Sequence, residues 1–238
     1  SRAGSPDRPI PSEQSAWEQV QALLGKEEIK AYAQLHAFGQ EDNAFYGESS
    51  SNTALTYAIA GPVGCGRRTA LRALAALWRE QGLLNSDDVH YASKGDLEAG
   101  YVGQSAGKVR GLVESAAGGT LAICSPSSLV PQSSTDNSFG PEVVGALASC
   151  MTAHAADTSF VFLDSPEGLE TFFRAYPSMR GQMARIFTLD DLTPTQMLQL
   201  FRSKTSESML FEPAVEELLE DFFLNWVSDR GGLGDASQ

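Results

Sequence analysis

Residues 61–69, Gly-Pro-Val-Gly-Cys-Gly-Arg-Arg-Thr, combine glycines and cations in the spacing of a phosphate-binding loop. The stretch matches the glycines of the pattern G-x-x-x-x-G-K-[ST], and it lies between an expected strand and an expected helix. In such a loop, backbone N–H groups and the N-terminus of the following helix surround phosphate oxygens. We therefore expect an anion-binding or nucleotide-binding site at Gly61, Gly64, Cys65, Gly66, Arg67, Arg68 and Thr69.

The two side chains that carry the chemistry of this pattern are changed. Arg67 stands at the position of the lysine, and Arg68 stands at the position of the hydroxyl that binds Mg²⁺. Arg67 keeps a positive charge, although its planar guanidinium is longer and differently shaped than an ammonium. The sequence therefore predicts that ATP or ADP binds without Mg²⁺. The alternative is an empty loop whose arginines are solvated or paired with acidic side chains.

The composition excludes several classes of protein. The formal net charge of −13 argues against a nucleic-acid backbone as the main partner. The 3 cysteines are widely spaced, which favours an intracellular reducing compartment without disulfides. The 3 scattered histidines predict no metal site. No apolar run approaches the ~20 residues that a membrane span needs.

Short apolar runs alternate with helical patterns, which predicts an α/β fold with a parallel sheet and helices on both faces. We expect strands at 54–60, 89–93, 120–124, 159–163 and 185–189. The pair Thr193-Pro194 predicts the start of a helix in a region without further strands. The expected organisation is a linker at 1–19, an α/β core at 20–190 and an incomplete helical lid at 191–238. Because the chain begins at Ser1 rather than Met, we expect it to be one piece of a longer protein.

Five fragments in a fixed order resemble the AAA+ ATPases of the CbxX/CfxQ type, which include red-type Rubisco activases and type VII secretion ATPases. The first fragment, Leu-Leu-Gly-Lys-Glu-Glu-Ile-Lys at 23–30, is similar to the family pattern L-[IV]-G-L-x-x-[VI]-K. The others lie at 61–69, 96–106, 139–144 and 172–180. The resemblance runs from about residue 20 to the end. It implies a P-loop core followed by a helical lid.

The resemblance also implies two functional segments. Tyr101, with Val102 and Gly103, would form a pore loop that grips a polypeptide client; the alternative is a half-buried loop tyrosine. Arg180 would be an arginine finger, or a surface arginine in a subunit contact. Aromatic and arginine side chains are concentrated at 172–185, and interface cores favour both types. We therefore expect this segment to be exposed and to contact a neighbouring subunit.

The sequence departs from the family pattern at the positions of catalysis. Cys124-Ser125 stands where the Walker B strand ends in Asp-Glu, and Ser237 replaces the sensor 2 arginine. A thiol is a poor ligand for Mg²⁺, and loss of a general base costs ~10²–10⁴ in rate. Asp164, at the sensor 1 position, ends a strand and is expected to cap a helix.

These departures predict a catalytically degenerate AAA+ subunit with no catalytic residues. It would be a structural or regulatory member of a ring or larger assembly with other AAA+ subunits. One alternative is an active, ATP-dependent protein remodelling ATPase of the CbxX/CfxQ type. The other is a monomeric interaction scaffold.

Overall fold

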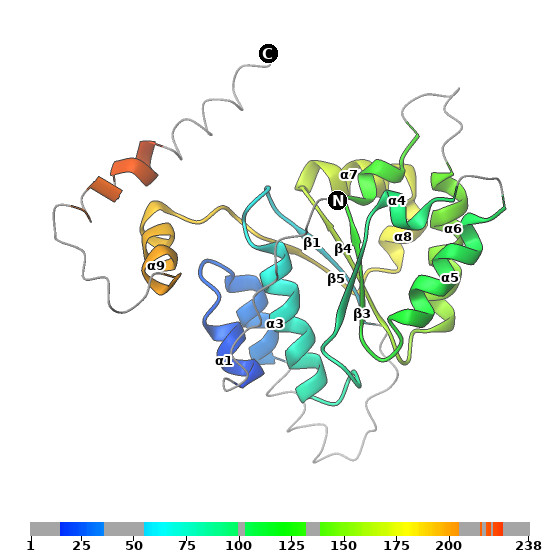
Figure 1. The fold of residues 1–238 in the computed structure, drawn as a ribbon, viewed down its shortest axis with the longest axis horizontal. Helices are drawn as coiled ribbons and strands as arrows, with labels where there is room; N and C mark the ends of the chain where they lie inside the picture. Colours follow the sequence, from blue (N-terminus) through cyan, green and yellow to red (C-terminus); the bar gives the residue numbers. More distant parts are fainter. Residues whose placement is uncertain are drawn as a thin grey trace, which may run out of the picture.

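The computed structural model describes residues 15–35, 55–99, 103–131, 139–204 and, near the C-terminus, 215, 218–219 and 221–225. Five strands form one sheet, with helices on both of its faces (Figure 1). The strands are β1 (Thr56–Ala60), β2 (Val89–Ala92), β3 (Thr120–Cys124), β4 (Ser159–Asp164) and β5 (Arg185–Thr188). The helices are α1 (Ala16–Gln21), a helix at 27–35, α3 (Arg67–Glu80), α4 (Lys94–Leu97), α5 (Ser105–Ser115), the 3₁₀ helix η1 (Pro126–Leu129), α6 (Gly140–Ala153), α7 (Pro166–Ala175), α8 (Pro177–Gly181) and α9 (Pro194–Lys204).

The strand order is β2-β3-β4-β1-β5, and every pairing is parallel. All residues of β1 and β4 are buried, as expected for central strands covered on both faces. This arrangement confirms the predicted α/β fold with a parallel sheet. Because parallel strands all end at one edge of the sheet, the residues that follow β1, β3 and β4 lie near one another, where such sheets bind ligands.

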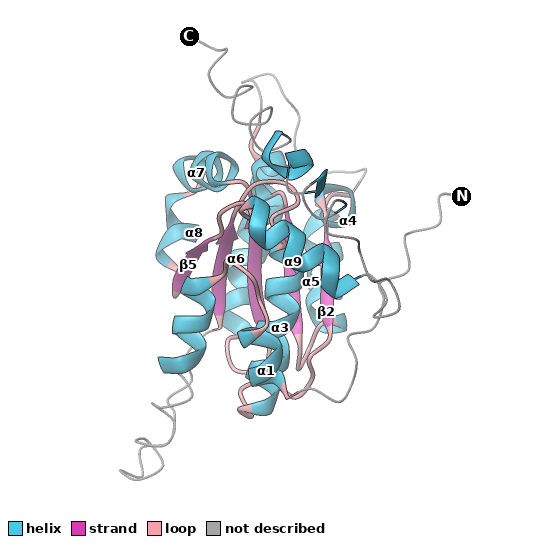
Figure 2. Ribbon diagram, turned by 90° about the vertical axis from the view of Figure 1, so that its left-hand side faces the viewer, coloured by secondary structure: helices cyan, strands magenta, loops and turns pink. Residues whose placement is uncertain are grey.

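One face of the sheet is covered by α1, residues 27–35 and α3 (Figure 2). The core on this side contains a hydrogen-bonded aromatic group. The hydroxyls of Tyr32 and Tyr57 lie 2.7 Å apart, and the indole N–H of Trp78 donates to the Tyr32 hydroxyl at 3.3 Å. Burial raises the pKa of both tyrosines. We call Tyr32, Tyr57 and Trp78 the polar aromatic cluster.

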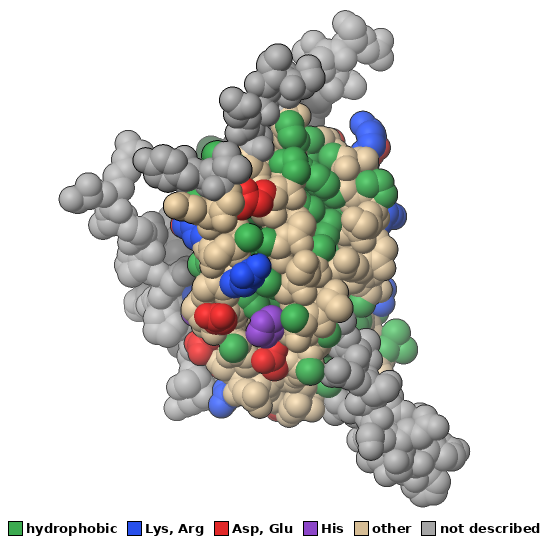
Figure 3. All heavy atoms as spheres, turned by 90° about the vertical axis from the view of Figure 1, so that its right-hand side faces the viewer, with side chains coloured by type: hydrophobic (Ala, Val, Ile, Leu, Met, Phe, Trp, Pro, Cys, Tyr) green, Lys and Arg blue, Asp and Glu red, His purple; other side chains and the backbone are tan. Residues whose placement is uncertain are grey.

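The opposite face is covered by α5, α6, α7 and α8, and its core is built from aliphatic and phenylalanine side chains. The rings of Phe162 and Phe172 stack with centroids 5.7 Å apart. On the outside of α5 and α6, Gly107 and Gly145 are exposed, and acidic and basic side chains are scattered over this face (Figure 3).

The expectation of an exposed aromatic segment at 172–185 is wrong. Phe172 and Met179 are fully buried and Phe173 is 5% exposed, because α7 and α8 turn these side chains into the core. The three arginines of this segment, Arg174, Arg180 and Arg185, are exposed. The aromatic content of the segment therefore reflects packing against the sheet and no longer supports a subunit contact.

The first and last core elements carry side-chain caps. Ser15 and Glu18 form a reciprocal capping box at α1, so the packed part of the chain already includes Ala16. Thr193 and Gln196 exchange two hydrogen bonds at the start of α9, at 2.9 and 3.2 Å, as the pair Thr193-Pro194 predicted.

On the outer edge of strand β5, one backbone N–H group is hydrogen-bonded to a side chain. The carboxylate of Glu28 accepts a hydrogen bond from the backbone N–H of Thr188 at 2.8 Å. The described helices include none that is both long and apolar enough to cross a membrane.

Candidate functional site: an arginine-lined cavity at the glycine-rich loop

The glycine-rich loop, residues 61–66, joins β1 to α3 and depends on glycine at three positions. Gly64 and Gly66 have φ angles of 92° and 94°, in the left-handed region that L side chains rarely adopt. A Cβ at Gly61 would lie 2.6 Å from the Cys65 sulfur and 2.9 Å from the Leu189 carbonyl oxygen. The loop can therefore close tightly against the end of β1 only without side chains at these positions.

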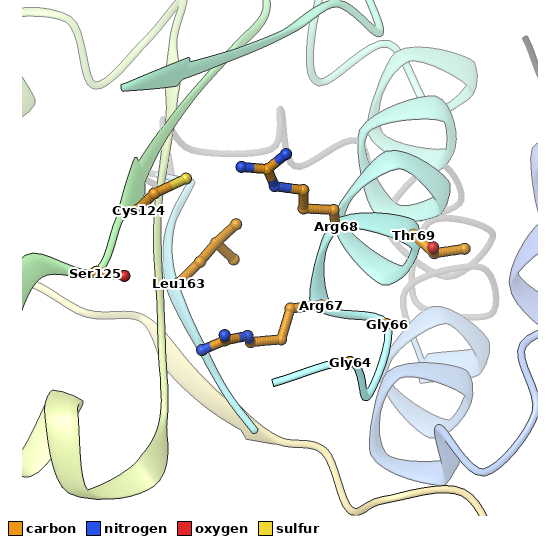
Figure 4. A pocket seen from close by; sticks show the side chains of 8 residues that line it. All are labelled: Gly64, Gly66, Arg67, Arg68, Thr69, Cys124, Ser125 and Leu163. Carbon is orange, nitrogen blue, oxygen red and sulfur yellow. The ribbon is translucent and has the colours of Figure 1, made fainter. Parts of the chain in front are cut away.

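A cavity of about 320 Å³ opens between this loop and the ends of β3 and β4 (Figure 4). It is lined by Gly64, Gly66, Arg67, Arg68, Thr69, Cys124, Ser125 and Leu163. The structure thus brings the predicted loop residues together with both residues at the Walker B position. Thr69 lines the cavity, although its side chain points away from the cavity's centre (Figure 4). Gly61 and Cys65 are not part of the lining, and Cys65 is buried in the core.

The two adjacent arginines have different environments. The Arg68 guanidinium lies over the Tyr91 ring, 4.8 Å from its centroid, and its charge lies near the Cys124 side chain (Figure 4). Burial raises the pKa of the Cys124 thiol, and the Arg68 charge opposes that rise. Arg68 therefore bridges α3 to β2 and β3 across one end of the cavity.

Arg67 extends along the other end of the cavity, below Leu163 in Figure 4. Its Nη1 atom is buried and has no hydrogen-bond partner among the described residues. A buried donor on a charged group that lacks a partner is costly. The Arg67 guanidinium is therefore the group in this cavity most in need of an anion.

The strand side of the cavity is made by the ends of β3 and β4. Ser125 follows β3 with a φ of 51°, the only positive φ of a non-glycine residue in the described parts of the chain. Its N–H donates to the Leu163 carbonyl at 2.8 Å, and its own carbonyl accepts from the Ser128 N–H at 2.9 Å. These bonds hold Ser125 in the left-handed region of φ/ψ space, which non-glycine residues rarely adopt. Residues with such strained backbone conformations are common at functional sites.

The lining does not fit Mg²⁺. None of the residues that line the cavity is a carboxylate, and Mg²⁺ in proteins is usually held by one or two carboxylates. The described residues also contain no group of three His, Cys, Asp or Glu side chains arranged for a metal ion. Cys124 offers a soft sulfur with a raised pKa in place of a hard oxygen.

Asp164 is near the cavity, but its carboxylate accepts hydrogen bonds from backbone N–H groups. Its carboxylate accepts hydrogen bonds from the N–H groups of Ser127 at 3.1 Å and Ser165 at 2.8 Å. Its carbonyl accepts from the Gly61 N–H at 3.1 Å. The prediction that Asp164 caps a helix is wrong, because Ser165 is the N-cap of α7 and accepts from the Gly168 N–H. Asp164 instead fixes η1 and the glycine-rich loop to the end of β4.

Sequence reasoning missed Lys26, a buried cation beside the loop. Its side chain is 4% exposed, and its ammonium donates to the Asp190 carbonyl at 3.0 Å. Burial lowers its pKa, while Cys65, Asp190 and Asp191 oppose that shift. A signal was available, since Lys26 occupies the second leucine position of the family pattern at 23–30.

The structure does not connect the other predicted functional residues to the cavity. Tyr101, Val102 and Ser237 lie outside the described residues. Gly103 has a φ of 83°, and its N–H donates to the Glu142 carboxylate at 3.3 Å. Arg180 is exposed on α8, 5.7 Å from the centroid of the Phe173 ring, and is not part of the cavity lining. Its predicted role as an arginine finger stays a prediction.

Comparisons with known proteins support the AAA+ resemblance. The chain is 25% identical over 185 residues to a CfxQ homologue of Cyanidium caldarium. The matched residues cover 77% of this chain and 63% of that protein. It is 24% identical over 185 residues to the chloroplastic Rubisco activase of Cyanidioschyzon merolae, with 77% and 61% covered. The chain thus spans about three-fifths of the length of these relatives. It matches no protein-family model.

A similar solved structure is the HORMA:CdnC:Trip13 complex of E. coli MS115-1. The matched chain superposes with a TM-score of 0.58 at 18% identity, covering 88% of this chain and 77% of that one. At this identity the match shows the fold alone. The sequence relatives and the matched fold agree, and the chain is similar to the AAA+ ATPases of the CfxQ and Rubisco activase type, as its sequence fragments predicted.

Proposed function

We propose that this chain is a catalytically inactive AAA+ module that binds a phosphate-bearing ligand without Mg²⁺. The observation that carries the proposal is the lining of the cavity, which has two arginines and no carboxylate. Such a site has positive charge for an anion and lacks the groups that hold the metal in an active ATPase.

The two arginines have separate roles in this proposal. Arg67 binds the ligand, because its buried Nη1 atom is unsatisfied and a phosphate oxygen is a matching acceptor. Arg68 is a bridge, because its guanidinium already contacts Tyr91 and Cys124. The loop itself contributes the backbone N–H groups near the N-terminus of α3.

The lack of hydrolysis follows from the strand side of the cavity. Ser125 cannot deprotonate or orient water as a glutamate does, and its backbone is held in a left-handed conformation. Cys124 replaces the metal-binding carboxylate, and its thiol is held neutral by burial. The competing proposal is an active remodelling ATPase, which the relatives at 24–25% identity favour.

The decisive measurement compares nucleotide binding with turnover on the purified chain. We expect ADP to raise the melting temperature equally in EDTA and in Mg²⁺, because no metal site contributes. A ligand at 100 times its Kd adds ~2.7 kcal/mol, and each kcal/mol is worth roughly 2–4 °C for a domain of this size. Phosphate release from ATP should equal the rate without protein.

Variants assign the effect to the cavity. Arg67→Ala should abolish the ADP-induced shift, and Arg68→Ala should reduce it while lowering stability. Arg79→Ala is the matched control, because Arg79 lies at the other end of α3 in an exposed ion pair with Asp87. Mg²⁺-dependent phosphate release by the unmodified chain would overturn the proposal in favour of the active ATPase.

We further propose that the module acts within a protein assembly with other AAA+ subunits. AAA+ relatives support this role. The alternative is a monomeric scaffold. Sedimentation equilibrium with and without ADP separates the two, since a concentration-independent monomer in both conditions would leave only the scaffold.

A further inference from the structure

Among the described residues, Lys26 is a buried cation that does not line the cavity. Every other described lysine or arginine side chain is at least partly exposed. Lys26 lies in the turn between α1 and the helix at 27–35, directly after Gly25, whose φ is 65°. A buried ammonium is costly unless hydrogen bonds and opposite charges compensate it.

The compensation comes from the segment that links β5 to α9. The Lys26 ammonium donates to the Asp190 carbonyl at 3.0 Å, and the charges of Asp190 and Asp191 favour its protonated form. On its other side, the Lys26 Cε atom lies 3.9 Å from the position that a Cβ would take at Gly66. One side chain therefore lies beside the glycine-rich loop and is hydrogen-bonded to the linker at 189–193.

Helix α9 contacts the same turn through a second side chain. The Gln196 amide oxygen lies 3.0 Å from the position that a Cβ would take at Gly25. The same amide oxygen accepts a hydrogen bond from the Thr193 N–H, which ties this contact to the cap of α9. The turn at Gly25 and Lys26 is thus the point where the loop, the linker and α9 meet.

We propose that Lys26 is a positioning residue that couples anion binding at the glycine-rich loop to the position of α9. The inference rests on the proposed function of that loop. If the linker moved, the ammonium would lose its acceptor and remain buried without a partner, so Lys26 restricts the linker to one position. An anion at the loop adds negative charge near Lys26, which stabilises its protonated form and strengthens its hydrogen bond to Asp190.

The coupling is measurable by hydrogen–deuterium exchange of the whole chain, without Mg²⁺, in the presence and absence of ADP. In the unmodified chain ADP should slow exchange in residues 61–69 and also in 189–204. In Lys26→Leu the linker and α9 should exchange at least about fivefold faster without ligand, the lower end of typical coupling between sites. ADP should then protect 61–69 alone, with weaker affinity, since coupling is reciprocal.

If Lys26 only stabilised the fold, Lys26→Leu would lower the melting temperature as well as speed exchange in α9. The proposal predicts a different result. Lys26→Leu removes a buried charge, so its melting temperature at pH 7 should be unchanged or higher even though α9 exchanges faster. Lys30→Leu is the control, because Lys30 lies four residues further along the chain, in the helix at 27–35, and forms a surface ion pair with Glu27. Lys26→Met serves as the second variant if Lys26→Leu folds poorly.

Two results would overturn the inference. One is unchanged exchange in 189–204 of the ligand-free Lys26→Leu and Lys26→Met chains; the other is equal protection of this segment by ADP in variant and unmodified protein. Failure of the proposed function looks different, because then ADP protects no segment of the unmodified chain. The ligand-free comparison of the variants still tests whether Lys26 holds the linker.

Discussion

The two faces of the sheet have different cores. Below α5, α6, α7 and α8 the core is aliphatic and phenylalanine, with Phe162 stacked on Phe172. Below α1 and α3, buried polar groups are present: the polar aromatic cluster and, beside the glycine-rich loop, Lys26. The apolar face depends on packing alone. The α3 face adds directional hydrogen bonds, with Lys26 beside the glycine-rich loop and the polar aromatic cluster towards the other end of α3. Buried hydrogen bonds favour one arrangement of their partners.

The largest expected effect tests the apolar face. Phe162→Ala should lower the free energy of unfolding by ~3–5 kcal/mol, because it removes a fully buried ring and leaves a cavity. Urea denaturation measures this change, with Phe162→Leu as the control that keeps most of the volume. The response of the melting temperature to ADP should not change, since Phe162 does not line the cavity. A lost ADP response in the folded variant would contradict the division between the faces.

The next effect tests the polar aromatic cluster. Tyr32→Phe removes the hydroxyl shared by Tyr57 and Trp78 and leaves both without this partner. We expect the free energy of unfolding to fall by about 1–3 kcal/mol, the cost of unsatisfied buried polar groups. Tyr176→Phe, at a half-buried tyrosine on the other face, is the control and should cost less. Equal losses in the two variants would show that the cluster adds nothing beyond packing.

The same cluster predicts loss of stability at alkaline pH. Burial raises the pKa of Tyr32 and Tyr57 in the folded protein. The unfolded chain ionises near the ordinary tyrosine pKa of about 10, whereas the folded state does not. The stability that these tyrosines provide is therefore fully present below pH 10 and is lost as the pH rises further. Urea titrations should show a shallower loss in Tyr57→Phe than in the unmodified chain, and parallel curves would contradict the assignment.

The smallest expected effect concerns Lys26. Burial lowers the pKa of its ammonium, so the charged form is disfavoured in the folded state. Stability should therefore rise as the pH increases from the lowered pKa towards the ordinary lysine value of about 10.4, and fall as the pH decreases. The difference in free energy of unfolding between the unmodified chain and Lys26→Leu should shift in favour of the unmodified chain as the pH rises above 7 towards the ordinary lysine pKa. Lys30→Leu should show no such trend.

Much of the fold follows from local sequence. The strand at 120–124 was predicted with its observed ends, because a run of apolar residues lies between a glycine turn and a Ser-Pro pair. Thr193-Pro194 marked the start of α9 for an equally local reason. The segment at 172–185 was misread even though a signal was present. Leu169, Phe172 and Phe173 have the i, i+3, i+4 spacing of a buried helix face.

The candidate site was only partly predictable. The glycines and arginines identified the loop, and the family pattern placed Cys124 and Ser125 at the same site. The different roles of Arg67 and Arg68 depend on Tyr91, a partner on β2 that no local pattern links to α3. Lys26 depends on a contact with residue 190, far along the chain. Such long-range contacts are set by tertiary packing and leave no periodic pattern in the sequence.

Glu28 has a consequence for how this protein behaves among others. β5 is the last strand of the sheet on its side, and an unpaired strand edge can template the addition of a strand from another chain. With the Glu28 carboxylate on the Thr188 N–H, an incoming strand must displace a charged side chain and leave it without its partner. Irregular aggregation through this edge of the sheet is thereby discouraged.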